Sequence, residues 1–220
     1  MNYGVMKRLA CSVGAAVLLS GVLSACVGPL LVGGAMVGGT LLATDRRTSG
    51  TQLDDEAIEL RAASQIRSSL GTRVRVGVVS YNRQVLLTGE VPNLQDKQRV
   101  EQVVSGVDGV ASVVNELAVL NSPSLMERSA DGLLTGRIKA VLLDELGLQS
   151  NAFKVVTERN TVYLMGRVTQ READRATEVV RATSGVQKVV RIFEIISEQE
   201  LERLRTALSS MQPAAKPAGI

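Results

Sequence analysis

Hydrophobic and polar residues alternate in two runs of the chain that are near copies of each other. Residues 78–91 read VVSYNRQVLLTGEV, and residues 155–168 read VVTERNTVYLMGRV. Each run holds two alternating segments separated by a polar turn, YNR in the first copy and ERN in the second. Alternation with a period of two is typical of half-buried strands, so each run predicts a β-hairpin. In the first hairpin, the shared buried face would consist of Val85, Leu87, Gly89 and Val91.

A helical pattern stands before each hairpin, and a second helical pattern follows it. In the second copy the core face of the first helix would be formed by Leu134, Ile138, Val141 and Leu142. We align Ile138 and Leu142 with Ile66 and Leu70 of the first copy. The second helices are expected at 94–105 and 170–183, and each copy then ends on a GV-x-x-VV strand. A helical crossover between strands is normally right-handed and makes them parallel. Each copy therefore predicts an α+β unit of order α-β-β-α-β, with a three-stranded mixed sheet and two helices on one face.

The two copies and their flanks give the predicted division of the chain. We predict a signal peptide at 1–25, a glycine-rich tether at 26–50, a first domain at 51–120, a linker at 121–130, a second domain at 131–196, and a charged helix with a disordered tail at 197–220. Asp54 and Asp131 are the expected N-caps of the first helix in each copy, and Ser197 is the expected N-cap of the charged helix.

The start of the chain has the architecture of a secretory signal. Lys7 and Arg8 precede an uncharged apolar run from residue 9 to residue 23, and small residues then lead to Cys26. The segment LSAC at 23–26 resembles the bacterial lipobox. That resemblance implies cleavage before Cys26, a diacylglyceryl group on its thiol and an acyl chain on the new amino terminus. The alternative is an unprocessed membrane helix that ends on a cysteine by chance.

The residues after Cys26 bear on where an anchored protein would be sorted. Position 27 is Val, whereas Asp at this place resembles an inner-membrane retention signal, so the outer membrane is favoured. The segment 27–45 is apolar but holds five glycines and one proline, which argue against a stable helix. We therefore predict a membrane-proximal tether, and a second transmembrane span is the alternative.

Together, the Val-x-Leu-x-Gly-x-Val strand, the helix after it and the GV…VV ending resemble the BON domain. The lipobox, the glycine-rich tether and the tandem units stand in the order of the dual-BON outer-membrane lipoproteins of Gram-negative bacteria. The resemblance implies a periplasm-facing protein that binds anionic phospholipid, supports outer-membrane integrity and gathers at the division site. The family resemblance points to the first helix of the second domain as the lipid-binding surface.

That helix, predicted at 131–146, is the one surface for which the sequence suggests a ligand. Spacing at 100° per residue puts Leu133, Arg137, Lys139 and Leu143 away from the core face. Apolar tips beside cations are typical of an anionic bilayer contact. The candidate phospholipid-binding residues are Leu133, Arg137 and Lys139, together with their neighbour Leu134. The alternative is that Leu133 and Leu143 pack against the other domain or the linker.

Composition narrows the chemistry that the chain can perform. Histidine is absent, tryptophan is absent, and five aromatic residues are present. Without Lys7 and Arg8, 23 basic residues face 22 acidic ones, so nothing indicates a nucleic-acid partner. Cys26 would be the only cysteine of the processed chain, and it would be lipidated. We expect no catalytic site, no metal and no cofactor beyond the acyl groups on Cys26.

Two other classes of function remain open at this stage. The first is a protein-interaction module for outer-membrane assembly or cell-wall remodelling factors, touching the membrane only through its acyl chains. The second is an envelope hydrolase, which the absence of histidine, of a free cysteine and of a supported Ser-Lys pair disfavours.

Overall fold

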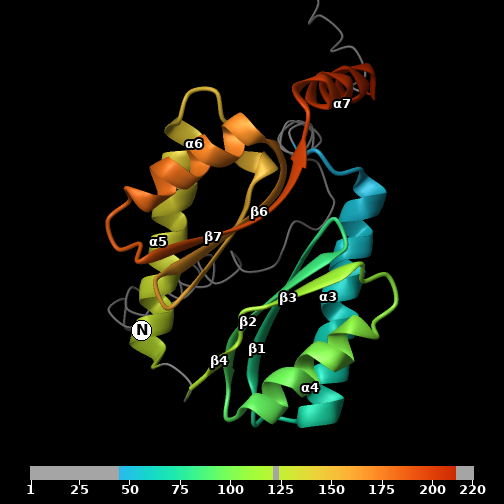
Figure 1. Cartoon of the computed structure of the whole chain (residues 1–220), viewed down its shortest axis with the longest axis vertical. Helices are drawn as coiled ribbons and strands as arrows, with labels where there is room; N and C mark the ends of the chain where they lie inside the picture. The colour runs from blue at the N-terminus through green and yellow to red at the C-terminus, as the bar shows by residue number, and fades with distance from the viewer. Residues whose placement is uncertain (1–44, 121–123, 212–220) are drawn as a thin grey trace, which may run out of the picture. The chain divides into compact units, whose positions relative to one another are not determined.

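The computed structural model describes residues 45–120 and 124–211, with side chains described up to residue 207. The predicted signal peptide, Cys26 and the tether up to residue 44 lie outside the described residues. Within them, two α+β units follow one another along the chain, and Figure 1 shows each as helices lying against a sheet. The first unit consists of α3 (Ser49–Leu70), β1 (Arg75–Tyr81), β2 (Gln84–Val91), α4 (Leu94–Ser105), β3 (Ser112–Asn115) and β4 (Ala118–Val119). The second consists of α5 (Leu125–Asp144), a 3-10 turn η2 (Ser150–Ala152), β5 (Lys154–Glu158), β6 (Thr161–Thr169), α6 (Gln170–Arg181) and β7 (Lys188–Ile196), and α7 (Glu198–Met211) follows it.

Both sheets have the predicted mixed topology. The strand order is β1-β2-β3 in domain 1 and β5-β6-β7 in domain 2, with the hairpin pairs antiparallel and the crossover pairs parallel. Domain 1 differs by one element, because β4 also pairs with β2 in parallel. Strands β3 and β4 are separated by residues 116 and 117, and the Leu117 amide donates to Oδ1 of Asn115 at 3.2 Å. The third strand of domain 1 is thus interrupted where that of domain 2 is continuous.

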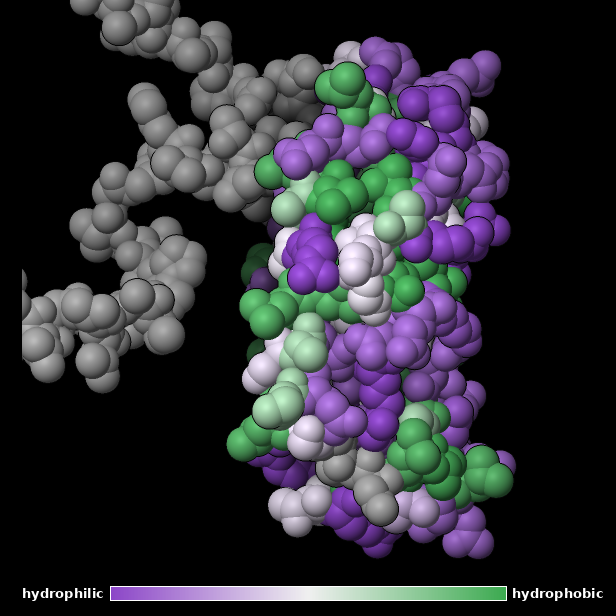
Figure 2. All heavy atoms as spheres, turned by 90° about the vertical axis from the view of Figure 1, so that its left-hand side faces the viewer, coloured by the Kyte–Doolittle hydropathy of each residue, from purple (hydrophilic) through white to green (hydrophobic). Residues whose placement is uncertain are grey.

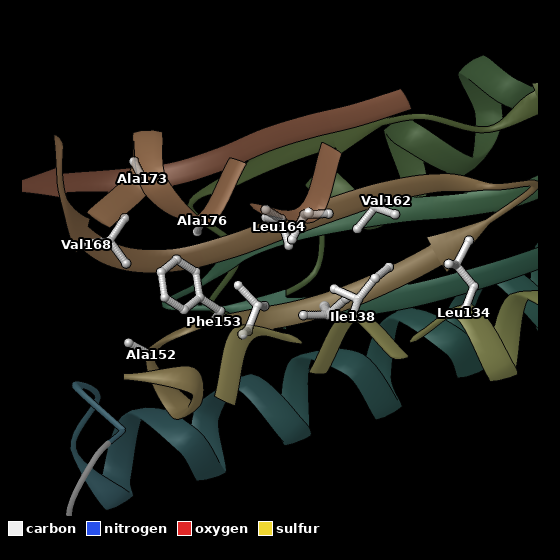
Figure 3. Packing of buried hydrophobic residues seen from close by; sticks show 12 residues of the cluster. Leu134, Ile138, Ala152, Phe153, Val162, Leu164, Val168, Ala173 and Ala176 are labelled. Carbon is white, nitrogen blue, oxygen red and sulfur yellow. The ribbon is translucent and has the colours of Figure 1, made fainter. Parts of the chain in front are cut away.

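The core of each domain lies between its sheet and its two helices. In domain 1, Val85, Leu87 and Val91 of β2 pack against residues of α3 and α4, as the alternation predicts. In domain 2, Leu134 and Ile138 are among the side chains that fill the space between α5 and the sheet (Figure 3). The prediction of two helices on one face is confirmed in both domains.

The first helix of each domain begins earlier than its predicted N-cap. The N-cap of α3 is Thr48, and α5 is capped by Ser124, whose side chain forms a capping box with Glu127. The predicted caps Asp54 and Asp131 are therefore wrong, and α5 starts within the predicted linker. Ser197 does accept from the amide of Glu200, as predicted for α7. The first turns of α3 and α5 were not predicted because most of their side chains are exposed and show no apolar period.

Two buried carboxylates hold the two hairpin turns. Asp55 of α3 accepts from the amides of Asn82 and Arg83, both at 2.8 Å, and from the hydroxyl of Ser80 at 2.6 Å. Asp131 of α5 likewise accepts from the amides at positions 159 and 160. The central residues of both turns have positive φ, which fits tight hairpin turns of the I′ type. Each helix therefore fixes the turn of its own hairpin.

This equivalence corrects the predicted alignment of the first helices. Asp55 and Asp131 play the same role, so the helices align with Ile58 opposite Leu134 and Ile66 opposite Leu142, one helical turn away from the predicted pairing. A shift of one turn preserves the apolar period, which is why periodicity could not exclude it.

Gly89 and Gly166 mark close approaches between backbones. A Cβ on Gly89 would lie 2.1 Å from the carbonyl oxygen of Arg75, and one on Gly166 would lie 2.3 Å from that of Ala152. Gly89 also has φ of +111°, a conformation that side-chain-bearing residues rarely adopt. Both glycines are required by the packing of the hairpin.

The faces of β2 and β6 that point away from the helices are also buried. Leu86 of β2 packs in one cluster with Tyr81 of the same domain and with Tyr163, Met165 and Ile192 of domain 2. The helix-free faces of the two sheets therefore share an apolar contact between the domains. Burial raises the pKa of Tyr81 and of Tyr163 to about 12.

Candidate functional site

Helix α5 presents two apolar faces, of which only one belongs to the core. Leu134, Ile138 and Leu142 are buried and pack inside domain 2. The prediction that Leu134 contacts lipid is wrong, because its side chain is 4% exposed and points into the core of the domain (Figure 3). The i, i+4 spacing from Leu134 to Ile138 is that of the core face.

Large apolar side chains also stand on the outer side of α5. The exposed fraction is 75% for Leu133 and 69% for Leu143, and Leu125 and Met126 in the first turn are more than two-thirds exposed. We call these four residues the outer row. The alternative in which Leu133 and Leu143 pack against the other domain or the linker is not seen among the described residues. Figure 2 looks onto the α5 and α6 side of the molecule and shows hydrophobic patches between hydrophilic ones.

The predicted cations flank the outer row. Arg137 and Lys139 are both exposed. The Arg137 guanidinium donates through Nη1 to the carbonyl of Ser184 at 2.8 Å, which steadies it over the α6–β7 loop. Lys139 makes no ion pair or hydrogen bond within the part of the chain that the structure describes. The outer row is therefore bordered by one cation that is held by a hydrogen bond, Arg137, and by one that is not, Lys139.

The segment before α3 reaches into domain 2. Arg46 donates through Nη1 to Oε2 of Glu172 at 2.8 Å and through Nη2 to Oε1 at 2.7 Å. Both side chains are 1% exposed, and Arg46 also donates to the carbonyl of Arg167. Burial alone would raise the pKa of Glu172, but the bonds from Arg46 and from the Thr169 amide outweigh it and lower that pKa. The sequence offered no signal for this pair.

A second ionic cluster joins the domains at the other end of the apolar contact. The buried carboxylate of Glu90 accepts from Arg75 of its own domain and from Arg159 of domain 2, the latter at 2.9 Å. Arg75 also pairs with Glu158. Burial opposes ionisation of Glu90, yet the two guanidinium groups outweigh it and lower the pKa of Glu90. At Glu158 burial prevails and raises the pKa. These contacts join β1 and β2 of domain 1 to the β5–β6 turn of domain 2.

The described residues contain neither a metal-binding cluster nor a membrane-spanning helix. Within residues 45–120 and 124–211, no group of three or more Cys, Asp or Glu residues is placed to hold a metal ion. None of the helices in this region is both long and apolar enough to cross a membrane. The acidic run that includes Asp54 and Glu56 is exposed on α3, while Asp55 serves the hairpin turn.

The chain is similar to proteins of known families. The BON domain family model matches residues 54–121 and 130–196. The chain is 36% identical over 198 residues to the "Outer membrane lipoprotein DolP" of Haemophilus influenzae, covering 89% of this chain and all of that protein. It is 33% identical to the "21 kDa hemolysin" of Actinobacillus pleuropneumoniae, over 69% of this chain and 79% of the other. It is 31% identical to the "Osmotically-inducible protein Y" of Escherichia coli, over 64% of this chain and 72% of the other.

Proposed function

This chain belongs to the BON-domain family, and we propose that it is an outer-membrane lipoprotein that faces the periplasm and binds anionic phospholipid through α5. In this proposal it has no catalytic activity. It supports outer-membrane integrity and gathers at the division site, as the resemblance to dual-BON lipoproteins implies.

The observation that carries the lipid proposal is the outer row on α5. A helix that packs on a sheet normally turns polar residues to solvent, yet α5 exposes Leu125, Met126, Leu133 and Leu143. Exposed apolar groups beside basic side chains favour the boundary between headgroups and acyl chains, where the apolar tips leave water and the cations meet phosphate. Arg137 and Lys139 are placed for the second role.

The anchor is proposed on the sequence of the first 26 residues and on the similarity to the lipoprotein of Haemophilus influenzae. A single acyl chain gives only marginal membrane binding, whereas two or more give stable anchoring. Replacement of Cys26 by Ala should release the protein from the outer-membrane fraction or leave it with its signal uncleaved. Fractionation of the Cys26→Ala variant with the outer membrane, as for the parent, would contradict the anchor.

The lipid surface can be tested separately from the anchor. The mature chain with Cys26→Ser retains every described residue and carries no acyl group. It should sediment with vesicles rich in phosphatidylglycerol, and Leu133→Glu should weaken this binding by loss of an apolar contact and by repulsion from phosphate. The matched control is Leu60→Glu, because Leu60 is a leucine of α3 with a similar exposed fraction of 74%.

Two outcomes would count against the lipid surface. Equal losses for Leu133→Glu and Leu60→Glu would mean that α5 has no special part in vesicle binding. No binding by the unlipidated parent would favour the other candidate, a protein-interaction module whose membrane contact comes only from the acyl chains. Circular dichroism of each variant would check that a loss of binding does not come from unfolding.

A further inference from the structure

Two consecutive arginines before α3 are bound in different domains. Within the described residues, Arg46 donates four hydrogen bonds, all to groups of domain 2, whereas Arg47 donates to the carboxylate of Asp55 in domain 1 at 2.8 Å. We call residues 45–47 the strap; they belong to the short blue stretch before α3 in Figure 1. The strap lies within the segment that the sequence predicts as the tether, so the described end of that segment is bound to both domains.

The contact of the strap with domain 2 is buried and bidentate. Each terminal nitrogen of Arg46 donates to one carboxylate oxygen of Glu172, at 2.8 and 2.7 Å, and both side chains are 1% exposed. Paired bonds of this kind fix the direction of the guanidinium as well as its distance, so the closed strap has one position. The Nε of Arg46 is buried without a hydrogen-bond partner among the described residues, so desolvation works against the closed position.

The contact of the strap with domain 1 is linked to the first hairpin. The guanidinium carbon of Arg47 lies 4.2 Å from the centre of the Tyr81 ring, and its partner Asp55 is the carboxylate that holds the β1–β2 turn. The Tyr81 hydroxyl accepts from the amide of Arg167 in domain 2 at 3.4 Å, and the carbonyl of Arg167 accepts from Arg46. The strap, Tyr81 and Arg167 therefore form a closed circuit of contacts through both domains.

The Arg46 pair joins the strap to the domain that carries the outer row. Glu172 stands in the first turn of α6, and α6 packs with α5 in the core of domain 2. Domain 1 follows the predicted tether in sequence, so the order of the chain alone would attach the tether to domain 1. The buried pair attaches it to domain 2 as well, across 126 residues of sequence.

We propose that the strap fastens the anchored tether to domain 2 and, while it is closed, holds the two domains in one arrangement. When the strap opens, the domains move relative to each other. The inference rests on the proposed function only through the anchor on Cys26, which connects the strap to the membrane. Because tension on an anchored tether reaches the strap before it reaches α3, the pair of Arg46 with Glu172 is the first of these contacts that such tension opens.

The first test measures how often the strap opens. A protease cleaves a segment only after the segment leaves its folded contacts, so the peptide bond after Arg47 is protected from trypsin while the strap is closed. The mature chain with Cys26→Ser is compared with the same chain carrying Glu172→Gln, which leaves the sequence of the strap unchanged and can keep the capping box. Glu172→Gln should speed cleavage after Arg47 by at least about tenfold, measured by mass spectrometry of the products.

Two controls separate opening of the strap from other causes of cleavage. Asp96→Asn changes the counterpart of Glu172 in α4, whose cation comes from domain 1, and should leave the rate after Arg47 unchanged. Cleavage after Arg75, within β1, reports unfolding of the hairpin and should rise less than cleavage after Arg47. Equal rates after Arg47 in the parent and in Glu172→Gln, or an equal rise at both bonds, would overturn the proposal.

The second test measures the arrangement of the domains. Nitroxide labels on Ser64→Cys of α3 and Gly136→Cys of α5 report one distance by pulsed EPR, because the processed chain with Cys26→Ser has no other cysteine. Both positions are exposed, and a Cβ on Gly136 meets no atom within 4 Å. The parent should give one narrow distance distribution and Arg46→Ala a broad one, with Glu172→Gln as the second variant if Arg46→Ala does not fold. A distribution that stays narrow in the folded variants would overturn the strap as the contact that holds the domains together.

The strap and the lipid surface fail in different ways, because neither test of the strap involves lipid. If Glu172→Gln opens the strap and broadens the distance distribution in a chain that does not bind vesicles, the strap stands and the proposed lipid surface fails. If vesicle binding depends on Leu133 but the cleavage rate and the distances do not respond to Glu172→Gln, the strap is wrong and the proposed function stands.

Discussion

Arg46 precedes the first helix of domain 1, yet its guanidinium is bound to the carboxylate of Glu172 in domain 2, through two hydrogen bonds of 2.7 and 2.8 Å. Glu172 stands in the first turn of α6, where it also forms the capping box with Thr169. The equivalent position in α4 of domain 1 is Asp96, and there the cation comes from Arg73 of the same domain. The acidic residue in the first turn of α6 is therefore paired with a cation from the segment before α3, whereas its counterpart in α4 is paired with a cation of its own domain.

Loss of this guanidinium should destabilise the protein strongly. Arg46→Ala leaves the Glu172 carboxylate buried without its partner, and breaking such a pair costs about 3 kcal/mol of unfolding free energy. Urea unfolding followed by circular dichroism measures the change. The control is Arg73→Ala, because the Arg73 side chain is 59% exposed and its pair should contribute no more than about 1 kcal/mol. Similar losses in the two variants would show that burial of the Arg46 pair has no special weight.

The substitution Glu172→Gln should destabilise the whole chain but stabilise an isolated domain 2. In the whole chain, Glu172→Gln weakens the pair with Arg46 and should lower the unfolding free energy. In a fragment of residues 124–211 Arg46 is missing, so Glu172→Gln removes an unpaired charge and should raise the melting temperature of the fragment. Glutamine can still serve the capping box. A substitution that lowers stability equally in fragment and whole chain would contradict the role assigned to Arg46.

Alanine at either strand glycine should be poorly tolerated. Gly89→Ala would bring a methyl group to 2.1 Å from the Arg75 carbonyl oxygen in a backbone conformation with φ of +111°. Crowding and strain of this kind cost about 2 kcal/mol or more, and Gly166→Ala should suffer from the crowding alone. Thermal unfolding provides the measurement.

The control for the strand glycines is a glycine with open space around it. A Cβ on Gly132 of α5 meets no atom within 4 Å, so Gly132→Ala should stabilise the helix by roughly 0.5 to 1 kcal/mol. A destabilised Gly132→Ala together with a neutral Gly89→Ala would mean that the backbone approaches described above are not present in solution.

Stability should fall in acid because buried carboxylates are held ionised. The pKa values of Asp55, Glu90 and Glu172 are all lowered, since hydrogen bonds from neighbouring groups outweigh the burial that opposes ionisation. A carboxylate whose pKa is lower in the folded state stabilises that state fully above its unfolded pKa of about 4, and this contribution is lost as the pH falls through the folded pKa. Glu158 acts in the opposite direction, because its raised pKa favours the folded state at low pH.

Urea unfolding at a series of pH values from about 7 to about 2 tests this balance. The unfolding free energy should fall below about pH 4, and Asp55→Asn should flatten the fall while lowering stability at neutral pH. A free energy that stays level, or rises, on acidification would show that the three carboxylates are not held ionised by their partners.

The sequence by itself determined the repeat and one face of each strand. The alternation of Val85, Leu87 and Val91 identified the face that packs on the helices, and α4 begins and ends where its pattern predicted. Periodicity sufficed because an amphipathic element has only one way to bury its apolar side. It also placed Leu133, Arg137 and Lys139 on the outside of α5, and it showed the position of Cys26, where an anchor is proposed.

Only the tertiary structure decided whether the helix-free faces of the sheets are buried or exposed. Leu86 and Glu90 alternate with the core residues of β2 and would face water in a lone domain, but contact between the two domains buries them. Glu90 tolerates burial because Arg75 and Arg159 neutralise it, and Arg159 lies 69 residues further along the chain. Arg46 and Glu172 are 126 residues apart. A local pattern reports how a segment buries its own apolar side, whereas an ion pair between distant segments depends on how two completed surfaces meet, and no periodicity records that.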